Sequence, residues 1–375
     1  MRREDGQGAL RTSLPSCAPP VLCSSRPVLR YLRRPLLPTL LMKLIVPMAG
    51  RGTRLRPHTH VTPKPLLPVA GTSMVERIIE TFVAAFPTPF TDAVFVLGPD
   101  FGGEVRDDLT AICARHGIAA AFAVQATARG TAHAVAQVGE HLDGECVVVF
   151  ADTLFVMEQV PAFTSDAVVW TMAVDDPSRF GVVVKSGDRI TAFVEKPDTP
   201  ISNEAIVGIY YVRDGAALGR EIQYLLDHDV TGKGDEFQIT DAFDRMLNAG
   251  QTFTTAAVTE WLDCGTIPAL METSGVVLGQ PGQNGKHGTV DSGATIVEPV
   301  FMGAGAVVRG ASTVGPNVSL EAGAVVEDST VRDSIVFANG TVRGSTLDGS
   351  LVGHHAVVTG FSGTLNVGDH ATVGE

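Results

Sequence analysis

The chain has 375 residues, of which 45% are hydrophobic, so it is long enough for two ordinary domains and its composition excludes a disordered or fibrous protein. Its formal net charge of −13 argues against a general nucleic-acid-binding protein, and no run of Lys or Arg occurs in the body of the chain. The five cysteines are scattered and lack paired metal-ligand spacing, which indicates a reduced cytoplasmic protein without structural zinc.

Residues 1–41 differ from the rest of the chain. They contain seven Arg against two acidic residues, are rich in Pro and Ser, and show no sustained periodicity. An Arg-Arg pair precedes the apolar stretch Leu36–Val46, as in an export signal, but cleavage after that stretch would damage the glycine-rich motif that follows. We therefore expect a disordered extension, or upstream sequence read through from a true start at Met42, and no segment that crosses a membrane.

From Met42 onward, expected strands and helices alternate. Short runs of apolar and β-branched residues predict strands at 43–46, 93–97 and 146–150. Apolar residues with helical spacing predict helices at Ser73–Phe86, around 105–112 and at 132–142. In the first helix the predicted buried stripe consists of Val75, Ile78, Ile79, Phe82 and Val83, and Ser73 with Glu76 forms a capping box. This order favours a parallel α/β sheet with helices on both faces.

Two later segments predict other local structures. The runs 182–185 and 190–195 flank Ser-Gly-Asp and predict a β-hairpin. The segment Gly275–Gly288 is dense in Gly and Gln and predicts a linker. We therefore expect an extension at 1–41, a first domain at 42–274, a linker at 275–288 and a second domain at 289–375.

The second domain has a six-residue repeat, typical of a β-helix in which each short strand stacks on its equivalent one coil away. The apolar members of the repeat are Val290, Ile296, Met302, Val308, Val314, Leu320 and Val326. Four residues after each of them comes a small or β-branched residue, and the spacing slips near Asp328, where we expect a loop or corner. Homo-oligomerisation is the expected purpose of such a domain.

The first candidate binding motif is the segment Gly50–Pro57, which is followed by Pro63–Pro68. Two glycines let backbone N–H groups approach a phosphate, Arg54 can form charge-assisted bonds to it, and Lys64 adds a point charge. A short Gly-x-Gly alone is equally consistent with a tight turn. It lacks the third glycine of a dinucleotide loop and the Gly-Lys-Ser/Thr of a Walker loop.

The whole string resembles the signature of the sugar-1-phosphate nucleotidyltransferases, and is most similar to long glucose-1-phosphate thymidylyltransferases with a C-terminal left-handed β-helix. Their Gly-x-Gly-Thr-Arg-Leu-x-Pro and Lys-Pro-Leu-Leu-Pro patterns are met at 50–57 and 64–68. The resemblance implies a Rossmann-like, mixed but mainly parallel sheet, an Mg²⁺ cofactor, and a nucleoside triphosphate and a sugar 1-phosphate as partners.

The resemblance also implies the site residues. The nucleotide would be bound by Ala49, Gly50, Gly52, Thr53, Gln125 and Gly130. The catalytic cations would be Arg54, Lys64 and Lys196. The sugar phosphate would be bound by Gly181, Glu195, Lys196 and Gly208. The metal would be held by Asp152 and Asp263.

The metal ligands also have a physical rationale. Asp152 follows a buried strand, at the carboxyl edge where open α/β sheets bind ligands, and a carboxylate suits Mg²⁺. Asp263 matches the second metal ligand of the resembled family. The family usually has Gly-Asp at the first of these positions, and Ala151 here departs from that pattern. The departure leaves the fit of base and sugar open.

The resemblance implies in-line attack by a sugar-phosphate oxygen on the α-phosphorus of dTTP or UTP, with pyrophosphate leaving. Glucose 1-phosphate is the expected sugar 1-phosphate. Gly130–Val135 is also similar to N-acetylglucosamine-1-phosphate uridylyltransferases, some of which add an acetyltransferase activity, and His354-His355 would then be a candidate base. A non-catalytic subunit that binds a sugar nucleotide is a third interpretation, motivated by Ala151.

Overall fold

The computed structural model describes residues 41–50, 52–157 and 160–374. The prediction for the extension 1–41 lies outside the described residues, apart from Leu41, and so does Arg51 within the glycine-rich motif. Among the described helices, none is long and apolar enough to cross a membrane.

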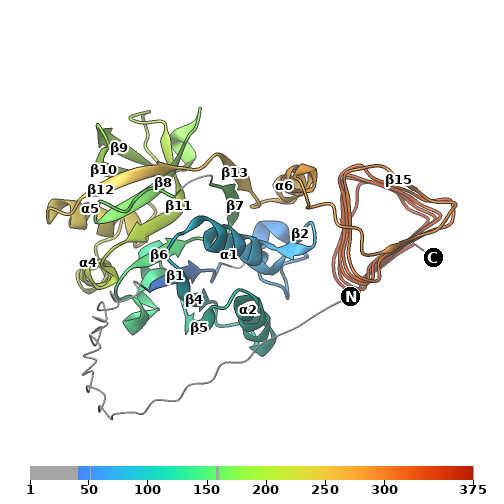
Figure 1. The fold of residues 1–375 in the computed structure, drawn as a ribbon, viewed down its shortest axis with the longest axis horizontal. Coiled ribbons are helices and arrows are strands. Elements are labelled where there is room, and N and C mark those ends of the chain that lie inside the picture. Colours follow the sequence, from blue (N-terminus) through green and yellow to red (C-terminus); the bar gives the residue numbers. More distant parts are fainter. Residues whose placement is uncertain (1–40, 51, 158–159, 375) are drawn as a thin grey trace, which may run out of the picture. The chain divides into compact units, whose positions relative to one another are not determined.

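A nine-stranded sheet forms the centre of the first domain, with strand order β5-β4-β1-β6-β11-β8-β12-β10-β9 (Figure 1). The half β5-β4-β1-β6 is parallel, whereas β11 runs antiparallel to both β6 and β8. The sheet is therefore mixed, and the parallel arrangement predicted from the alternating pattern holds for this first half. The strands are β1 (Met42–Pro47), β4 (Phe90–Leu97), β5 (Ala119–Val124), β6 (Cys146–Val149), β8 (Ala167–Ala173), β9 (Gly181–Ser186), β10 (Arg189–Glu195), β11 (Glu204–Val212) and β12 (Phe253–Ala257).

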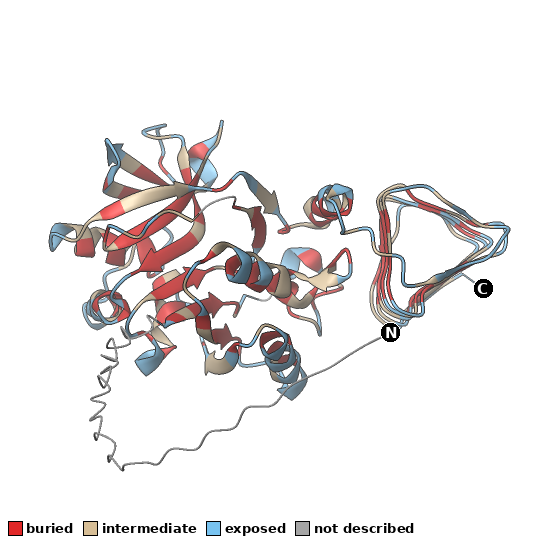
Figure 2. Ribbon diagram, in the orientation of Figure 1, coloured by how far each residue is buried: buried red, intermediate tan, exposed pale blue. Residues whose placement is uncertain are grey.

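Helices cover both faces of this sheet and bury two apolar clusters (Figure 2). Successive strand residues point to opposite faces, so Leu44 of β1 lies in one cluster and Ile45 in the other. One cluster includes residues of α1, α2 and α6, and the other includes residues of α3, α4 and α5. The helices are α1 (Met74–Ala85), α2 (Gly103–Arg115), α3 (Thr131–Ala136), α4 (Gly215–Asp227), α5 (Ile239–Asn248) and α6 (Ile267–Gly279).

The helix predictions are right in kind and less accurate at their ends. The Ser73 hydroxyl accepts a hydrogen bond from the Glu76 backbone N–H at the start of α1, as predicted. Val83, predicted to be buried, is 43% exposed, because it lies at the margin of the apolar stripe. The helix predicted at 132–142 is too long: α3 ends at Ala136, and a 3₁₀ turn begins at Gly139, whose φ of 55° is left-handed.

Short elements complete the first domain around the sheet. The predicted hairpin is formed by β9 and β10, which pair antiparallel around Gly187. The strands β7 (Thr153–Val156) and β13 (Glu260–Asp263) form a separate antiparallel pair, and β2 (Pro68–Val69) and β3 (Thr72–Ser73) form another. Besides the 3₁₀ turn that begins at Gly139, the described residues form the 3₁₀ turns η1 (Thr53–Leu55), η2 (Lys64–Leu66) and η4 (Pro177–Arg179).

The second domain is a three-sided coil of short parallel strands, visible around β15 in Figure 1. This confirms the β-helix predicted from the six-residue repeat. One sheet contains β14 (Thr289–Val290), β17 (Val307–Arg309), β20 (Val325–Glu327), β23 (Thr341–Arg343), β26 (Val357–Thr359) and β29 (Thr372–Val373). The next contains β15 (Thr295–Ile296), β18 (Thr313–Val314), β21 (Thr330–Arg332), β24 (Thr346–Asp348) and β27 (Ser362–Gly363). The third contains β16 (Val300–Met302), β19 (Val318–Leu320), β22 (Ser334–Val336), β25 (Leu351–Val352) and β28 (Asn366–Val367).

The slip near Asp328 marks a change in coil length. One coil advances 18 residues, from Val307 to its partner Val325, and the next advances 16, from Val325 to Thr341. Asp328 stands at the corner where this happens, with a φ of 47°, and its carboxylate accepts a hydrogen bond from the Ala311 backbone. A corner is thus confirmed at this position.

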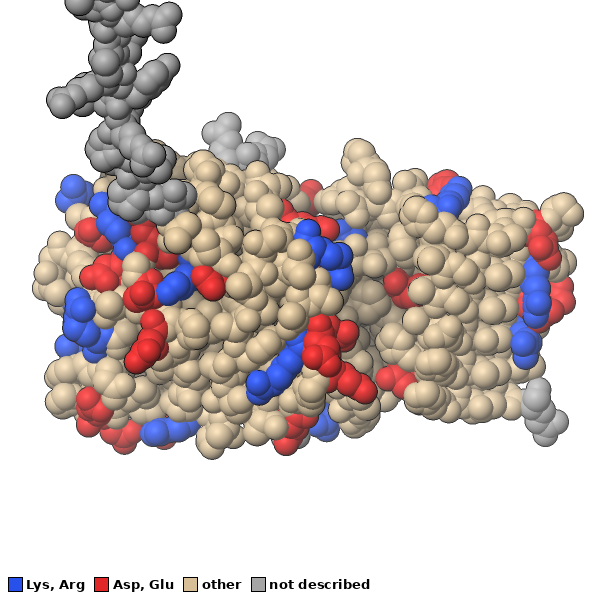
Figure 3. Space-filling model, turned by 60° about the horizontal axis from the view of Figure 1, so that its bottom comes forward, with Lys and Arg blue, Asp and Glu red and all other residues tan. Residues whose placement is uncertain are grey.

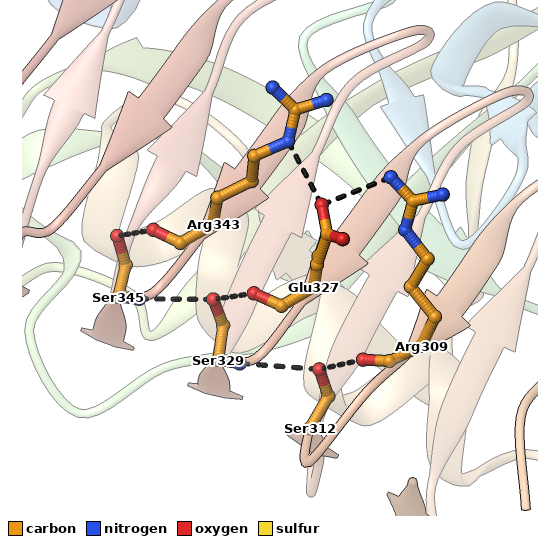
Figure 4. Close-up of polar contacts among 6 residues, drawn as sticks. All are labelled: Arg309, Ser312, Glu327, Ser329, Arg343 and Ser345. Atoms are coloured by element: carbon orange, nitrogen blue, oxygen red, sulfur yellow. Dashed lines mark hydrogen bonds and ion pairs between the residues drawn. The ribbon is translucent and has the colours of Figure 1, made fainter. Parts of the chain in front are cut away.

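Serines at one corner of the coil form a polar ladder (Figure 4). The Ser329 hydroxyl donates to the Glu327 carbonyl at 2.7 Å and accepts from the Ser345 backbone N–H at 3.0 Å. The Ser312 and Ser345 hydroxyls donate in the same way to carbonyls of their own coils. Outside the ladder, the Glu327 carboxylate pairs with Arg309 and Arg343 on the neighbouring coils. Each serine therefore satisfies the backbone where the coil turns.

The β-helix packs on the first domain through its third sheet. Ile335, Phe337 and Leu351 are buried in the same apolar cluster as α1 and α6. Near the start of the coil, the Glu321 carboxylate accepts from the Gly71 backbone N–H at 3.2 Å and from the Ser319 hydroxyl at 2.7 Å. Helix α6 extends to Gly279, into the segment predicted as a linker, and the domain limits stay a prediction.

Candidate functional site

A cavity of about 710 Å³ opens at the carboxyl edge of the central strands. Its walls come from segments far apart in the sequence, which the sheet order brings together. They are Arg54, Thr131, Phe150, Asp152, Thr153, Arg179, Phe180, Gly181, Glu195, Lys196, Ile206, Val207, Gly208, Tyr210, Gln238, Ile239, Thr240, Trp261 and Asp263. Six of the predicted site residues therefore share one cavity with Arg54.

A smaller cavity of about 270 Å³ adjoins it and is lined by the glycine-rich motif. Gly50, Gly52 and Lys64 lie here, and the two cavities share Arg54, Phe150 and Asp152. Arg54 and Asp152 thus stand at the boundary between two spaces. This arrangement suits a pair of ligands that meet at their charged ends.

The two predicted metal ligands are brought together by the pairing of β7 with β13. Asp263 pairs directly with Thr153, and Asp152 is the residue before Thr153. The Asp263 carboxylate also accepts a hydrogen bond from the Gly265 backbone N–H at 2.7 Å. A Cβ at Gly265 would lie 2.9 Å from the Asp263 carboxylate and 3.1 Å from the Arg54 guanidinium, so this glycine leaves room for both groups.

Lys64 is buried beneath the same region. Its ammonium donates to the Asp152 backbone carbonyl at 2.5 Å. Burial lowers the pKa of Lys64, and the nearby Asp152 carboxylate opposes that change. Desolvation raises the pKa of Asp152, and Lys64 is the main opposing influence. The two groups therefore depend on each other for charge compensation, and an additional cation beside Asp152 would favour its charged form.

Glu195 is the last residue of β10, Lys196 follows it, and both line the larger cavity. The Lys196 N–H donates to the Phe180 carbonyl at 3.0 Å, and its φ of 44° is left-handed, which turns the chain sharply after the strand. The Lys196 ammonium lies 3.5 Å from the Glu195 carboxylate. The Lys233 ammonium donates to the Lys196 carbonyl at 2.5 Å, so a second loop holds this turn.

Two glycines that line the same cavity leave space that a side chain would fill. A Cβ at Gly181 would lie 2.8 Å from the Glu195 carboxylate. Gly208 has a φ of 94° and lies where the register of β11 with β8 shifts, and its carbonyl accepts from the Phe150 N–H at 3.0 Å. The bulge moves the backbone of β11 to form the floor of the cavity.

Four predicted nucleotide-binding residues do not line either cavity. Gln125 is 6% exposed, and its side-chain nitrogen contacts the His133 ring at 2.9 Å. Gly130 packs against Phe237, where a Cβ would lie 2.5 Å from a backbone oxygen. Ala49 and Thr53 also stand outside the two walls, although they are neighbours of Gly50 and Gly52. Their roles stay predictions.

Several cavity residues were not singled out from the sequence. Phe180 and Trp261 form an aromatic wall with ring centroids 4.8 Å apart, and Arg179 adds a cation. Gln238 comes from the loop before α5. Arg179 and Phe180 directly precede Gly181, and Trp261 is two residues before Asp263. Three of these four residues therefore lie within two positions of a predicted site residue in the sequence, and Gln238 does not.

Charges are mixed over the surface outside the site. On the face drawn in Figure 3, basic and acidic side chains lie beside one another rather than in separate fields. Among the described residues, this face carries no large positive field, so positive charge for binding an anion must come from the few cationic side chains that line the cavities.

Comparisons with known proteins agree with this geometry. The model of the family described as nucleotidyl transferase matches residues 43–278. A glucose-1-phosphate thymidylyltransferase of Streptomyces griseus is 28% identical over 88% of this chain and 98% of that protein. A low-salt glycan biosynthesis nucleotidyltransferase of Haloferax volcanii is 30% identical over 68% of this chain and 71% of its own length.

Among solved structures, the chain is similar to a putative glucose-1-phosphate thymidylyltransferase from Bacillus anthracis in complex with a sucrose. The two share 27% identity with a TM-score of 0.50, over 63% of this chain and 94% of that one. The match to the family model and the similarity in fold confirm the resemblance drawn from the sequence.

Proposed function

The chain belongs to the nucleotidyl transferase family, and we propose that it transfers a nucleotidyl group from dTTP or UTP to a sugar 1-phosphate, releasing pyrophosphate. Glucose 1-phosphate is the first candidate acceptor, because a relative named for that substrate aligns along 98% of its own length. The observation that carries the proposal is the pair Asp152 and Asp263 on a cavity wall, with Asp152 shared by a second cavity.

The two cavities suggest where each substrate binds. The triphosphate would lie in the smaller cavity against Gly50 and Gly52, with Arg54 and Lys64 close to its phosphates. The sugar 1-phosphate would lie in the larger cavity, where Glu195 can accept from sugar hydroxyls and Lys196 can bind the phosphate. Phe180 and Trp261 offer an apolar wall on which the flat face of a sugar can pack.

The reaction needs positioning more than acid–base chemistry. A phosphomonoester is largely dianionic near neutral pH, since its second pKa is about 6, so the attacking oxygen needs no general base. The barrier lies in bringing two anionic groups together, and Arg54, Lys64 and Lys196 lower it by charge neutralisation. Lys64 is fixed from two directions, by the 3₁₀ turn η2 and by its bond to the Asp152 carbonyl.

The residues present fit a hard divalent cation. Asp152 and Asp263 offer carboxylate oxygens from adjacent strands, and both are open to the cavity. These two side chains would hold Mg²⁺, which when bound would neutralise phosphate charge at the α-phosphorus. Desolvation raises the pKa of Asp152 and the Asp263 carboxylate adds to this, so a bound cation would favour the charged form of Asp152.

The sequence left two alternatives open, a non-catalytic subunit and an added acetyltransferase activity, and the structure favours neither. Intact Asp152, Asp263, Lys64 and Lys196 in connected cavities support an enzyme over a non-catalytic subunit. For an added acetyltransferase activity, the His354 ring stacks on Phe337 with centroids 5.2 Å apart, which engages it in packing rather than leaving it as a free base. We also propose a cytoplasmic location and a homo-oligomer formed through the β-helix, both from the sequence.

A substrate matrix tests the proposal. Each of the common nucleoside triphosphates is combined with glucose 1-phosphate, N-acetylglucosamine 1-phosphate and other sugar 1-phosphates, and pyrophosphate release is followed with Mg²⁺ and after chelation. We expect release with dTTP or UTP that depends on both the sugar phosphate and the metal. Release that ignores the sugar phosphate, or no release with any pair, would contradict the proposal. Gel filtration with light scattering tests the oligomer.

A further inference from the structure

The segment after the glycine-rich motif folds back onto it. The Thr59 hydroxyl donates to the Gly52 carbonyl at 2.7 Å, and the Leu55 N–H donates to the same carbonyl at 2.9 Å. Gly52 has a φ of 56°, and a Cβ on it would lie 2.9 Å from the Lys64 side chain. The shape of the phosphate-facing backbone therefore depends on where residues 55–59 are held.

The last part of the β-helix contacts this same segment. The His58 Nε2 donates to the Asn366 side-chain oxygen at 2.5 Å, and the Asn366 side-chain nitrogen reaches the Arg56 carbonyl at 3.5 Å. Both contacts require the same orientation of the Asn366 amide, which makes Nε2 the protonated nitrogen of His58. Beside them, a Cβ on Gly368 would lie 3.0 Å from Pro57, so the two backbones approach closely.

The buried position of His58 leaves one of its ring nitrogens without a hydrogen-bond partner among the described residues. Its ring is 1% exposed, meets Phe337 edge to face at 5.2 Å, and keeps Nδ1 buried without a partner among the described residues. Burial lowers the pKa of His58, so the ring is neutral near pH 7. An apolar side chain would fill this space without leaving an unpaired acceptor. The imidazole adds a directional bond to packing.

A second set of polar contacts between the domains has a different target. Glu321 binds the backbone of Gly71, and Arg77 binds the Val69 and Ala70 carbonyls and the Gln283 side chain. These bonds hold the β2–β3 turn, whose residues line neither cavity described above. Among the described residues, the hydrogen bonds of Asn366 instead reach the segment of Arg56 and His58, whose neighbour Thr59 binds Gly52.

We propose that Asn366 and His58 are positioning residues, through which the last coil of the β-helix sets the affinity of the glycine-rich motif for the nucleoside triphosphate. The inference rests on the proposed function, because it takes Gly50 and Gly52 as the phosphate-facing backbone. It assigns the β-helix a part in binding one substrate, separate from any part in assembly.

The test is the variant Asn366→Ala, since Asn366 is exposed on the outside of the coil and its loss leaves the coil interior intact. We expect the Kd for dTTP or UTP, measured by calorimetry on the full chain without sugar phosphate, to rise about fivefold, as for loss of one hydrogen bond. KM for the sugar 1-phosphate should stay at its wild-type value, while the thermal midpoint falls slightly because the buried His58 Nε2 loses its acceptor. Asn366→Asp keeps an acceptor for His58 and should retain most of the affinity.

The matched control is Ser362→Ala, an exposed residue of the same coil on β27, away from this contact. It should leave both substrate constants unchanged. Wild-type triphosphate affinity in Asn366→Ala would overturn the inference while leaving the proposed function intact. So would equal weakening of the binding of both substrates, which is the pattern of a structural role. A wild-type protein that binds no triphosphate would overturn the proposed function and this inference together.

Discussion

The two domains use their polar side chains in opposite ways. In the β-helix, each corner serine both donates and accepts, so the turns are closed by complete hydrogen bonding (Figure 4). In the first domain, Asp152, Asp263 and Lys196 face an open cavity, and Asp152 carries a raised pKa from desolvation. The contrast indicates that the coil is built for stability and the cavity walls for binding charged ligands. Variants in each region should therefore affect different measurements.

The largest effect is expected from Asp263→Ala. Loss of this carboxylate removes one of the two groups that we propose hold the metal, and kcat should fall by about 10²- to 10³-fold, as when one electrostatic contact to a transition state is lost. The thermal midpoint should hardly change, because Asp263 is exposed to the cavity. Glu260→Ala, an exposed carboxylate at the other end of β13, is the matched control and should keep wild-type turnover. Wild-type turnover in Asp263→Ala at saturating Mg²⁺ would refute its role.

Ser329→Ala should produce the reverse pattern. Ser329 is 2% exposed, and its removal leaves the buried Ser345 N–H without its acceptor, which costs about 1–3 kcal/mol. We expect a lower midpoint of thermal unfolding with KM and kcat unchanged. Thr330→Ala, on the exposed side of the same coil, provides the comparison and should unfold close to wild type. If Ser329→Ala and Thr330→Ala unfold at the same midpoint, the serine ladder does not stabilise the coil.

The sequence predicted the two domains unequally. The six-residue repeat predicted the β-helix because every coil repeats the same local environment, from Val308 to Val358. The slip in the spacing located the corner at Asp328, but the change from 18 to 16 residues per coil was read from the pairing of the strands. In the first domain, local patterns predicted β1, β4 and β6, but the antiparallel insertion of β11 between β6 and β8 is a long-range pairing.

The site residues were predicted from sequence motifs, which say nothing of how these residues lie relative to one another in the fold. Asp152 and Asp263 are more than a hundred residues apart, and only the pairing of β7 with β13 makes them neighbours. Phe180 and Arg179 had no motif of their own and emerged from the geometry. The hydrogen bond between His58 and Asn366 could not be predicted from the sequence, because neither residue belongs to a recognised motif and the two come from different domains.

The central claim is that separate parts of one connected site hold two different substrates, and Lys196→Ala tests it most directly. Loss of this ammonium should raise KM for the sugar 1-phosphate about tenfold, as expected for a charged hydrogen bond, with KM for the triphosphate unchanged. Lys185→Ala, on β9 and outside both cavity walls, is the control and should leave both constants at wild-type values. An unchanged KM for the sugar 1-phosphate in Lys196→Ala, or an equal rise for both substrates, would contradict the account.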